Sequence, residues 1–209
     1  MFEALRRALR NAYHLLLLAW AAALGAGLGL GSAWYTLEGD YPFGERRAQA
    51  WVAWPTVGAP DSDPYARAIL ARSGDVPLAL GEGIAFHALA DELGRPLDAA
   101  CDYEISGETP VARYWTLTLY DAATSRPVET PQRRPGLTSA QALRDEAGGV
   151  TIALSPTPKP GNWLQTPVRG RLEAVLRLYD SPVSGAIGWL GEGAMPRVVR
   201  TGCGGRATS

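Results

Sequence analysis

Lysine is almost missing from this chain of 209 residues: Lys159 is the only lysine among 20 basic side chains. Histidine and cysteine are also scarce, with two residues of each. The formal net charge is -1 and no cluster of basic residues stands out, which argues against a nucleic-acid-binding protein. The sequence also lacks the spacing of a zinc site, a calcium loop or a glycine-rich phosphate loop. We therefore expect neither a metal nor a cofactor.

One long uncharged run, residues 12–30, lies near the N-terminus. At about 1.5 Å per residue, a helix of this length spans most of a hydrocarbon core of roughly 30 Å. Arg6, Arg7 and Arg10 precede the run, and the positive-inside rule places such a flank in the cytoplasm.

This pattern predicts a single-pass protein of a bacterial inner membrane. We expect residues 1–11 in the cytoplasm, a transmembrane anchor over 12–34, and the remainder in the periplasm. A cleaved signal peptide is the alternative. The anchor is favoured because the apolar run is long for a signal peptide and no clear Ala-x-Ala site follows it.

The rest of the chain has the composition of a β protein. Glycine (24 residues) and proline (16 residues) are abundant, which fits many turns between short strands. Runs of β-branched, aromatic and aliphatic residues predict strands near 78–86, 103–105, 113–121, 150–154 and 172–180. No crossover helices of sufficient length separate them, so we expect a mainly β fold, an antiparallel β-sandwich.

A short helix is predicted after Asp61-Ser62-Asp63-Pro64. Ser62 or Asp63 can cap its first free N–H groups, and Gly74 would end it. We interpret residues 35–60 as a connector, 61–182 as the β-sandwich domain, and 183–209 as a C-terminal tail that could add an edge strand at Val198 and Val199.

The strand over 113–121 has one apolar and one mixed face. Trp115, Leu117 and Leu119 alternate with Tyr114, Thr116, Thr118 and Tyr120. The first set predicts a core face. The second set could meet water, another sheet or a ligand.

Several stretches at fixed spacing resemble a known family. They are Asp63-Pro64-Tyr65-Ala66-Arg67-Ala68, Gly81-Glu82-Gly83 with Phe86, Cys101-x-Tyr103, 112–118, Gly161-Asn162-Trp163-Leu164 and Leu176-Arg177-Leu178-Tyr179. Over about residues 55–182 the chain resembles the domain-of-unknown-function 1214 family of bacterial envelope proteins. The resemblance implies a β-sandwich of jelly-roll type and, as partner, an envelope protein of the 1254 family. It brings no established activity.

The two cysteines, Cys101 and Cys203, would face an oxidising compartment after translocation, where one disulfide is possible. Two inert thiols are the alternative. A shared metal site is not expected, since His14 lies in the anchor and His87 is the only other imidazole.

Three charged residues in apolar strands are candidates for a site. Glu82, Arg113 and Arg177 could form a salt bridge inside or at the rim of the sandwich, because an unpaired inward arginine is costly. Alternatively they could bind an anion or a sugar, with aromatic walls from Trp115, Tyr120 and Trp163.

Enzymatic chemistry has weaker support. His87 could act as a general base beside Asp91 or Glu82, and Glu82 could pair with Asp121 or Asp180 for glycoside hydrolysis. We therefore favour a binding or interaction module that works with a partner envelope protein. The alternatives are a hydrolase or carbohydrate-active enzyme, with its site at the sandwich mouth or partner interface, and a purely structural envelope protein.

Overall fold

The structure, a computed structural model, describes residues 2–38, 44–73, 77–79, 81–182 and 195–203. It divides into two compact units, Met1–Pro42 and Phe43–Ser209, which we describe separately. The first unit holds one helix, α1 (Phe2–Glu38). Within α1, Leu9–Thr36 is long and apolar enough to cross a membrane, with a mean hydropathy of 1.8 and no part of it buried. Length and composition alone do not distinguish a membrane span from a signal sequence.

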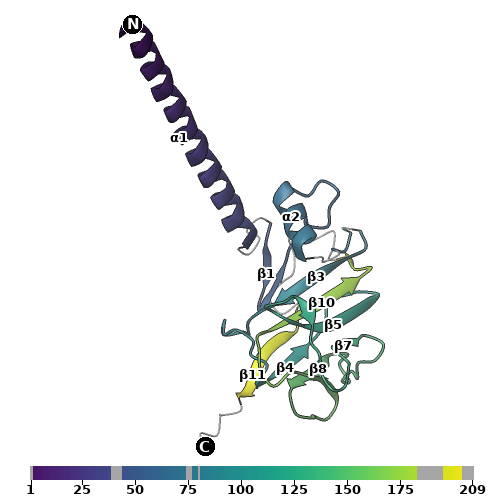
Figure 1. The fold of residues 1–209 in the computed structure, drawn as a ribbon. Helices are drawn as coiled ribbons and strands as arrows, with labels where there is room; N and C mark the ends of the chain where they lie inside the picture. The colour runs from purple at the N-terminus through teal and green to yellow at the C-terminus, as the bar shows by residue number, and fades with distance from the viewer. Residues whose placement is uncertain (1, 39–43, 74–76, 80, 183–194, 204–209) are drawn as a thin grey trace, which may run out of the picture. The chain divides into compact units, whose positions relative to one another are not determined.

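The second unit is mainly β, with two sheets and one short helix (Figure 1). The larger sheet has seven strands in the order β1-β2-β3-β10-β5-β6, and β7 also pairs with β5. Their bounds are β1 (Arg46–Ala48), β2 (Trp51–Ala53), β3 (Gly83–Ala88), β5 (Tyr114–Asp121), β6 (Arg126–Pro127), β7 (Gly136–Thr138) and β10 (Leu172–Tyr179). All of these pairs are antiparallel.

The smaller sheet has four strands in the order β11-β4-β8-β9. They are β4 (Cys101–Gly107), β8 (Val150–Ser155), β9 (Asn162–Gln165) and β11 (Arg197–Cys203). The prediction of a wholly antiparallel fold is wrong at one place, because β8 and β9 run parallel. The proline-rich segment 156–161 connects them, and this short segment suffices because β9 begins opposite Ile152, only a few residues back along β8.

Both sheets contribute to one hydrophobic core. The alternation predicted for residues 113–121 is confirmed, since Trp115, Leu117 and Leu119 are all buried in it. Tyr103 and Ile152 from the smaller sheet belong to the same cluster. Because each strand turns alternate side chains to opposite faces, burying one face leaves the other for solvent or ligands.

The predicted helix is α2 (Pro64–Ser73). The Asp63 carboxylate caps it by accepting hydrogen bonds from the N–H groups of Tyr65 (2.9 Å) and Ala66 (3.2 Å). Gly74, expected to end it, lies outside the described residues. The strand expected over 78–86 begins only at Gly83, and Glu82 lies in the turn before it.

The sheets extend beyond the limits predicted for the domain, 61 and 182. Within the expected connector, β1 and β2 join the larger sheet, and Trp51 is fully buried. Within the expected tail, β11 pairs with β4 along its length, including Cys203 opposite Cys101.

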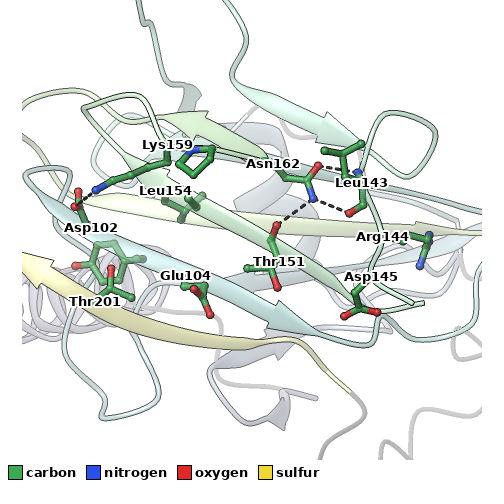
Figure 2. A pocket seen from close by; sticks show the side chains of 14 residues that line it. Asp102, Glu104, Leu143, Arg144, Asp145, Thr151, Leu154, Lys159, Asn162 and Thr201 are labelled. Carbon is green, nitrogen blue, oxygen red and sulfur yellow. Dashed lines mark hydrogen bonds and ion pairs between the residues drawn. The ribbon is translucent and has the colours of Figure 1, made fainter. Parts of the chain in front are cut away.

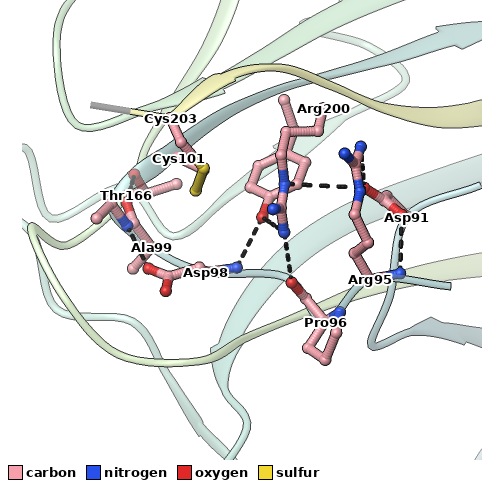
Figure 3. The surroundings of a disulfide bond; sticks show 11 residues. Asp91, Arg95, Pro96, Asp98, Ala99, Cys101, Thr166, Arg200 and Cys203 are labelled. Atoms are coloured by element: carbon pink, nitrogen blue, oxygen red, sulfur yellow. Dashed lines mark hydrogen bonds and ion pairs between the residues drawn. A yellow bond between two sulfur atoms is a disulfide. The ribbon is translucent and has the colours of Figure 1, made fainter. Parts of the chain in front are cut away.

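The predicted disulfide between Cys101 and Cys203 is present (Figure 3). A polar network lies beside it. The buried Asp91 carboxylate accepts a hydrogen bond from Arg95 at 2.7 Å and lies 3.8 Å from the Arg200 guanidinium. Arg200 also donates to the hydroxyl of Tyr103 at 3.0 Å. Disulfide and network together fasten the last described strand to the body of the domain.

Candidate functional site

The outer face of the larger sheet carries the best-formed polar and aromatic surface near the predicted site residues. On β5 this face consists of Tyr114, Thr116, Thr118 and Tyr120, which oppose Tyr179, Arg177, Val175 and Glu173 of β10 in register. On the far side of β5, Gly136 and Thr138 of β7 oppose Thr118 and Thr116. We call the face made by these ten residues, of which Val175 is buried, the tyrosine face.

Arg177 lies at the centre of the tyrosine face. Its guanidinium donates a hydrogen bond to the Tyr120 hydroxyl at 3.0 Å and lies 5.4 Å from the centroid of that ring. These two contacts orient the positive charge of the guanidinium. Where β5 begins and β10 ends, the rings of Tyr114 and Tyr179 pack with their centroids 6.0 Å apart. The face therefore combines a fixed cation with aromatic surfaces.

A hollow of about 470 Å³ lies over this face. Its lining consists of Thr116, Thr118, Tyr120, Pro135, Gly136, Leu137, Thr138, Arg177 and Tyr179. Its volume falls in the range usual for small-molecule sites, about 300–1,000 Å³. Gly136 is required at its edge, because a Cβ atom there would lie 2.7 Å from the carbonyl oxygen of Leu117. A side chain at 136 would push β7 away from β5.

A histidine–carboxylate pair lies farther along the same face. His87 Nδ1 is 2.6 Å from Glu173 Oε1, and the two side chains are 19% and 16% exposed. The ring of Trp54 meets the imidazole edge-on, with centroids 5.5 Å apart. The partner of His87 is therefore Glu173, and not the Asp91 or Glu82 that the sequence suggested. Asp91 instead binds Arg95.

The six predicted site residues do not form one site. Arg177 and Tyr120 come together, as described. Trp115 is 2% exposed and belongs to the core, so the expectation that it walls a ligand site is wrong. Trp163 lies on β9 of the other sheet, where its indole N–H donates to the carbonyl of Ser155 at 3.0 Å.

Glu82 and Arg113 each contact Asp180 at one end of the larger sheet. The carbonyl of Glu82 accepts a hydrogen bond from the N–H of Asp180, and the Arg113 guanidinium lies 3.8 Å from the Asp180 carboxylate. The side chains of Arg113 and Asp180 are 82% and 73% exposed, so solvent screens this pair. The expected Glu82–arginine salt bridge does not occur among the described residues, and Asp180 is the carboxylate beside Arg113.

Asp121, another predicted carboxylate, has a local role. It accepts hydrogen bonds from the N–H groups of Ala123 and Thr124 and from the Thr124 hydroxyl. The two bonds from Thr124 and the one from Ala123 hold the pKa of the Asp121 carboxyl below its usual value, against the smaller effect of desolvation. This carboxylate therefore closes its own turn.

Sequence reasoning missed the contribution of Thr138, Tyr179 and Glu173. The alternation of residues 113–121 identified the outward side chains of β5. Which strands lie beside β5 was not readable, because β10 follows it some fifty residues later in the chain and β7 is only three residues long.

Comparisons with known proteins give a family and a fold. Residues 82–183 match the family described as a protein of unknown function, DUF1214. A search of curated proteins returned no match. The crystal structure of the VPA0106 protein from Vibrio parahaemolyticus is similar, with a TM-score of 0.53 and 21% identity, over 67% of this chain and 36% of that one.

A second solved structure is more distant. An uncharacterized protein from Burkholderia cenocepacia aligns with a TM-score of 0.43 and 17% identity, over 86% of this chain and 51% of that one. The chain thus spans 36% and 51% of the length of these two proteins. At 21% identity, the similarity to the Vibrio parahaemolyticus protein concerns the fold alone.

Proposed function

We propose that the chain, whose residues 82–183 match the DUF1214 family of proteins of unknown function, is a membrane-anchored binding module whose ligand lies on the tyrosine face. The observation that carries the proposal is the hollow of about 470 Å³ around the Arg177–Tyr120 pair. Among the residues that line it, all of them described by the structure, there is no carboxylate and no imidazole. Such a lining supports binding better than acid–base chemistry.

The lining chemistry favours an acidic saccharide as ligand. The Arg177 guanidinium offers planar donors to a carboxylate. The hydroxyls of Thr116, Thr118 and Thr138 can exchange hydrogen bonds with sugar hydroxyls, because each both donates and accepts. The ring of Tyr179, also in the lining, offers an apolar surface to the C–H face of a sugar.

We also propose that α1 is an uncleaved anchor in a bacterial inner membrane, with residues 1–11 in the cytoplasm and the β domain in the periplasm. Support comes from the apolar Leu9–Thr36 segment and the arginines before it. The disulfide of Cys101 and Cys203 supports an oxidising compartment. The jelly-roll type of the sandwich and a 1254-family partner remain proposals from the family resemblance.

A binding measurement on the full-length protein in lipid nanodiscs tests the ligand. The probes are a glucuronate-containing oligosaccharide and the neutral oligosaccharide made by reducing its carboxylates to alcohols. We expect the acidic probe to bind more tightly, and Arg177→Ala to weaken its binding about tenfold or more, since hydrogen bonds to charged groups contribute most.

Arg113→Ala is the matched control. It removes an exposed arginine at the end of the same sheet, outside the hollow, and should leave binding of the acidic probe unchanged. Equal losses in both variants would mean that the positive charge of any arginine on this sheet, and not the hollow of the tyrosine face, attracts the probe. Equal binding of both probes would refute the acidic ligand.

One observation favours a hydrolase or carbohydrate-active enzyme as second candidate. The His87–Glu173 pair has the geometry in which a carboxylate orients an imidazole as general base. Incubation of the same oligosaccharides with full-length protein, followed by mass spectrometry, tests it. Cleavage that is lost in His87→Gln would establish the enzyme, whereas intact oligosaccharides together with tight binding support the binding module.

A further inference from the structure

A second hollow, of about 520 Å³, lies over the outer face of the smaller sheet, away from the tyrosine face (Figure 2). Its floor comes from Asp102 and Glu104 of β4, Thr151 and Ala153 of β8, and Thr201 of β11. Its two rims are the segments 143–145 and 159–161. We call this hollow the outer groove.

Both rims of the outer groove are held in place by side chains. Asn162 is 8% exposed and makes three hydrogen bonds: its carbonyl accepts from the N–H of Leu143 at 2.7 Å, and its amide donates to the carbonyls of Leu143 and Thr151. On the other side, the Lys159 ammonium donates to Asp102 at 2.8 Å. A binding site whose walls are ordered before the ligand arrives loses less entropy on binding.

The charges in the outer groove are mostly paired. Lys159 neutralises Asp102, and its hydrogen bond is the main cause that holds the pKa of the Asp102 carboxyl below its usual value. Asp145 accepts hydrogen bonds from the N–H groups of Ala147 and Gly149 in its own turn. Arg144 donates to the carbonyl of Gly148 in that turn.

Glu104 differs from these residues. It is half-buried on the central part of β4, and Figure 2 shows it between the Asp102–Lys159 pair and the Asp145 turn. Among the described residues, neither a hydrogen bond nor an ion pair satisfies its side chain. The strand register places Val199, Ala153 and Trp163 in the same row of the sheet, so its neighbours across the strands are apolar.

A half-buried carboxylate without a protein donor favours a cationic ligand group, because an opposite charge offsets the lost hydration. The hydroxyls of Thr151 and Thr201 line the same hollow and suit ligand hydroxyls. From this arrangement we propose that the outer groove binds a hydroxylated primary amine, the chemistry of an amino sugar, with its ammonium group on Glu104. This site is separate from the one under Proposed function and carries the opposite charge preference.

The test compares two trisaccharides on the full-length protein in nanodiscs, at a pH below the pKa of the amine. One probe is the glucosamine trimer, with free ammonium groups, and the other is its N-acetylated form, which has the same ring framework without the charge. We expect the amine to bind about tenfold or more tightly than its acetylated form. Glu104→Gln, which keeps the shape of the side chain, should abolish that difference.

Glu129→Gln is the matched control, because it removes the same charge from an exposed position that does not line the outer groove. Its binding of the amine should equal that of the unaltered protein. Near-UV circular dichroism confirms that both variants are folded. Hydrogen exchange adds an independent measurement: the amine should slow exchange in β4 and in segments 143–145 and 159–161.

The proposal is overturned if Glu104→Gln binds the amine as tightly as the unaltered protein, if both trisaccharides bind equally, or if both glutamine variants lose affinity alike. Arg177→Ala separates this result from the tyrosine face. That variant should leave amine binding unchanged whether or not the acidic saccharide binds to the tyrosine face.

Discussion

Replacing Trp115 by alanine should destabilise the β domain more than any single surface change. The indole is 2% exposed and sits on β5, the strand flanked by β10 and β7 in the larger sheet. A hollow of only about 10 Å³ lies beside it, lined in part by Trp51, Ile105 and Ile152. So little free space means that the neighbours are packed against the ring and cannot easily collapse into the gap.

The expected cost is about 3–5 kcal/mol, the usual range for Trp→Ala or Phe→Ala in a core. This is a large share of the roughly 5–15 kcal/mol that stabilises a typical domain. For a domain of this size each kcal/mol lowers the melting temperature by about 2–4 °C, so Trp115→Ala should lower it by roughly 6–20 °C. Thermal unfolding followed by near-UV circular dichroism measures the shift.

Trp115→Phe is the control, because it keeps a large ring. It also removes an indole N–H for which the described residues provide no hydrogen-bond acceptor. Removing an unsatisfied buried donor offsets part of the lost packing, so we expect a much smaller shift than for alanine. An unchanged melting temperature in Trp115→Ala would refute the placement of this side chain in the core.

Three further outcomes are expected. Replacing both Cys101 and Cys203 by serine should lower the free energy of unfolding by roughly 4–5 kcal/mol in the chain-entropy model, since the disulfide closes a loop with a sequence separation of 102. An unchanged midpoint of urea unfolding would contradict this. Burial raises the pKa of Asp91, but hydrogen bonds from Arg95 and Leu93 outweigh this effect and leave the pKa lowered. The carboxylate therefore stabilises the fold above about pH 4, and this stabilisation is lost as the pH falls through its folded-state pKa. The free energy of unfolding of Asp91→Asn should depend less on pH in that acid range. Removing residues 1–42 should yield a folded, soluble domain, and aggregation of that chain under oxidising conditions would count against a separate anchor.

Local patterns in the sequence determined several features. Alternation over residues 113–121 correctly divided Trp115 from Tyr114 and Tyr120, because neighbouring side chains of a strand always point to opposite faces. A cap at Ser62 or Asp63 was predicted, and Asp63 provides it, because a cap acts on N–H groups two and three residues away. The long apolar run predicted α1, and two cysteines could form only one internal disulfide.

Only the tertiary structure decided which residues meet. Arg177 contacts Tyr120, and Glu173 contacts His87, because β10 lies between β5 and β3 in the larger sheet. The outer groove likewise needs four strands and two loops from distant parts of the chain. The order and register of strands depend on packing a shared core, which no local pattern encodes, and this is why the sequence grouped Trp115 and Trp163 into one site while the fold separates them.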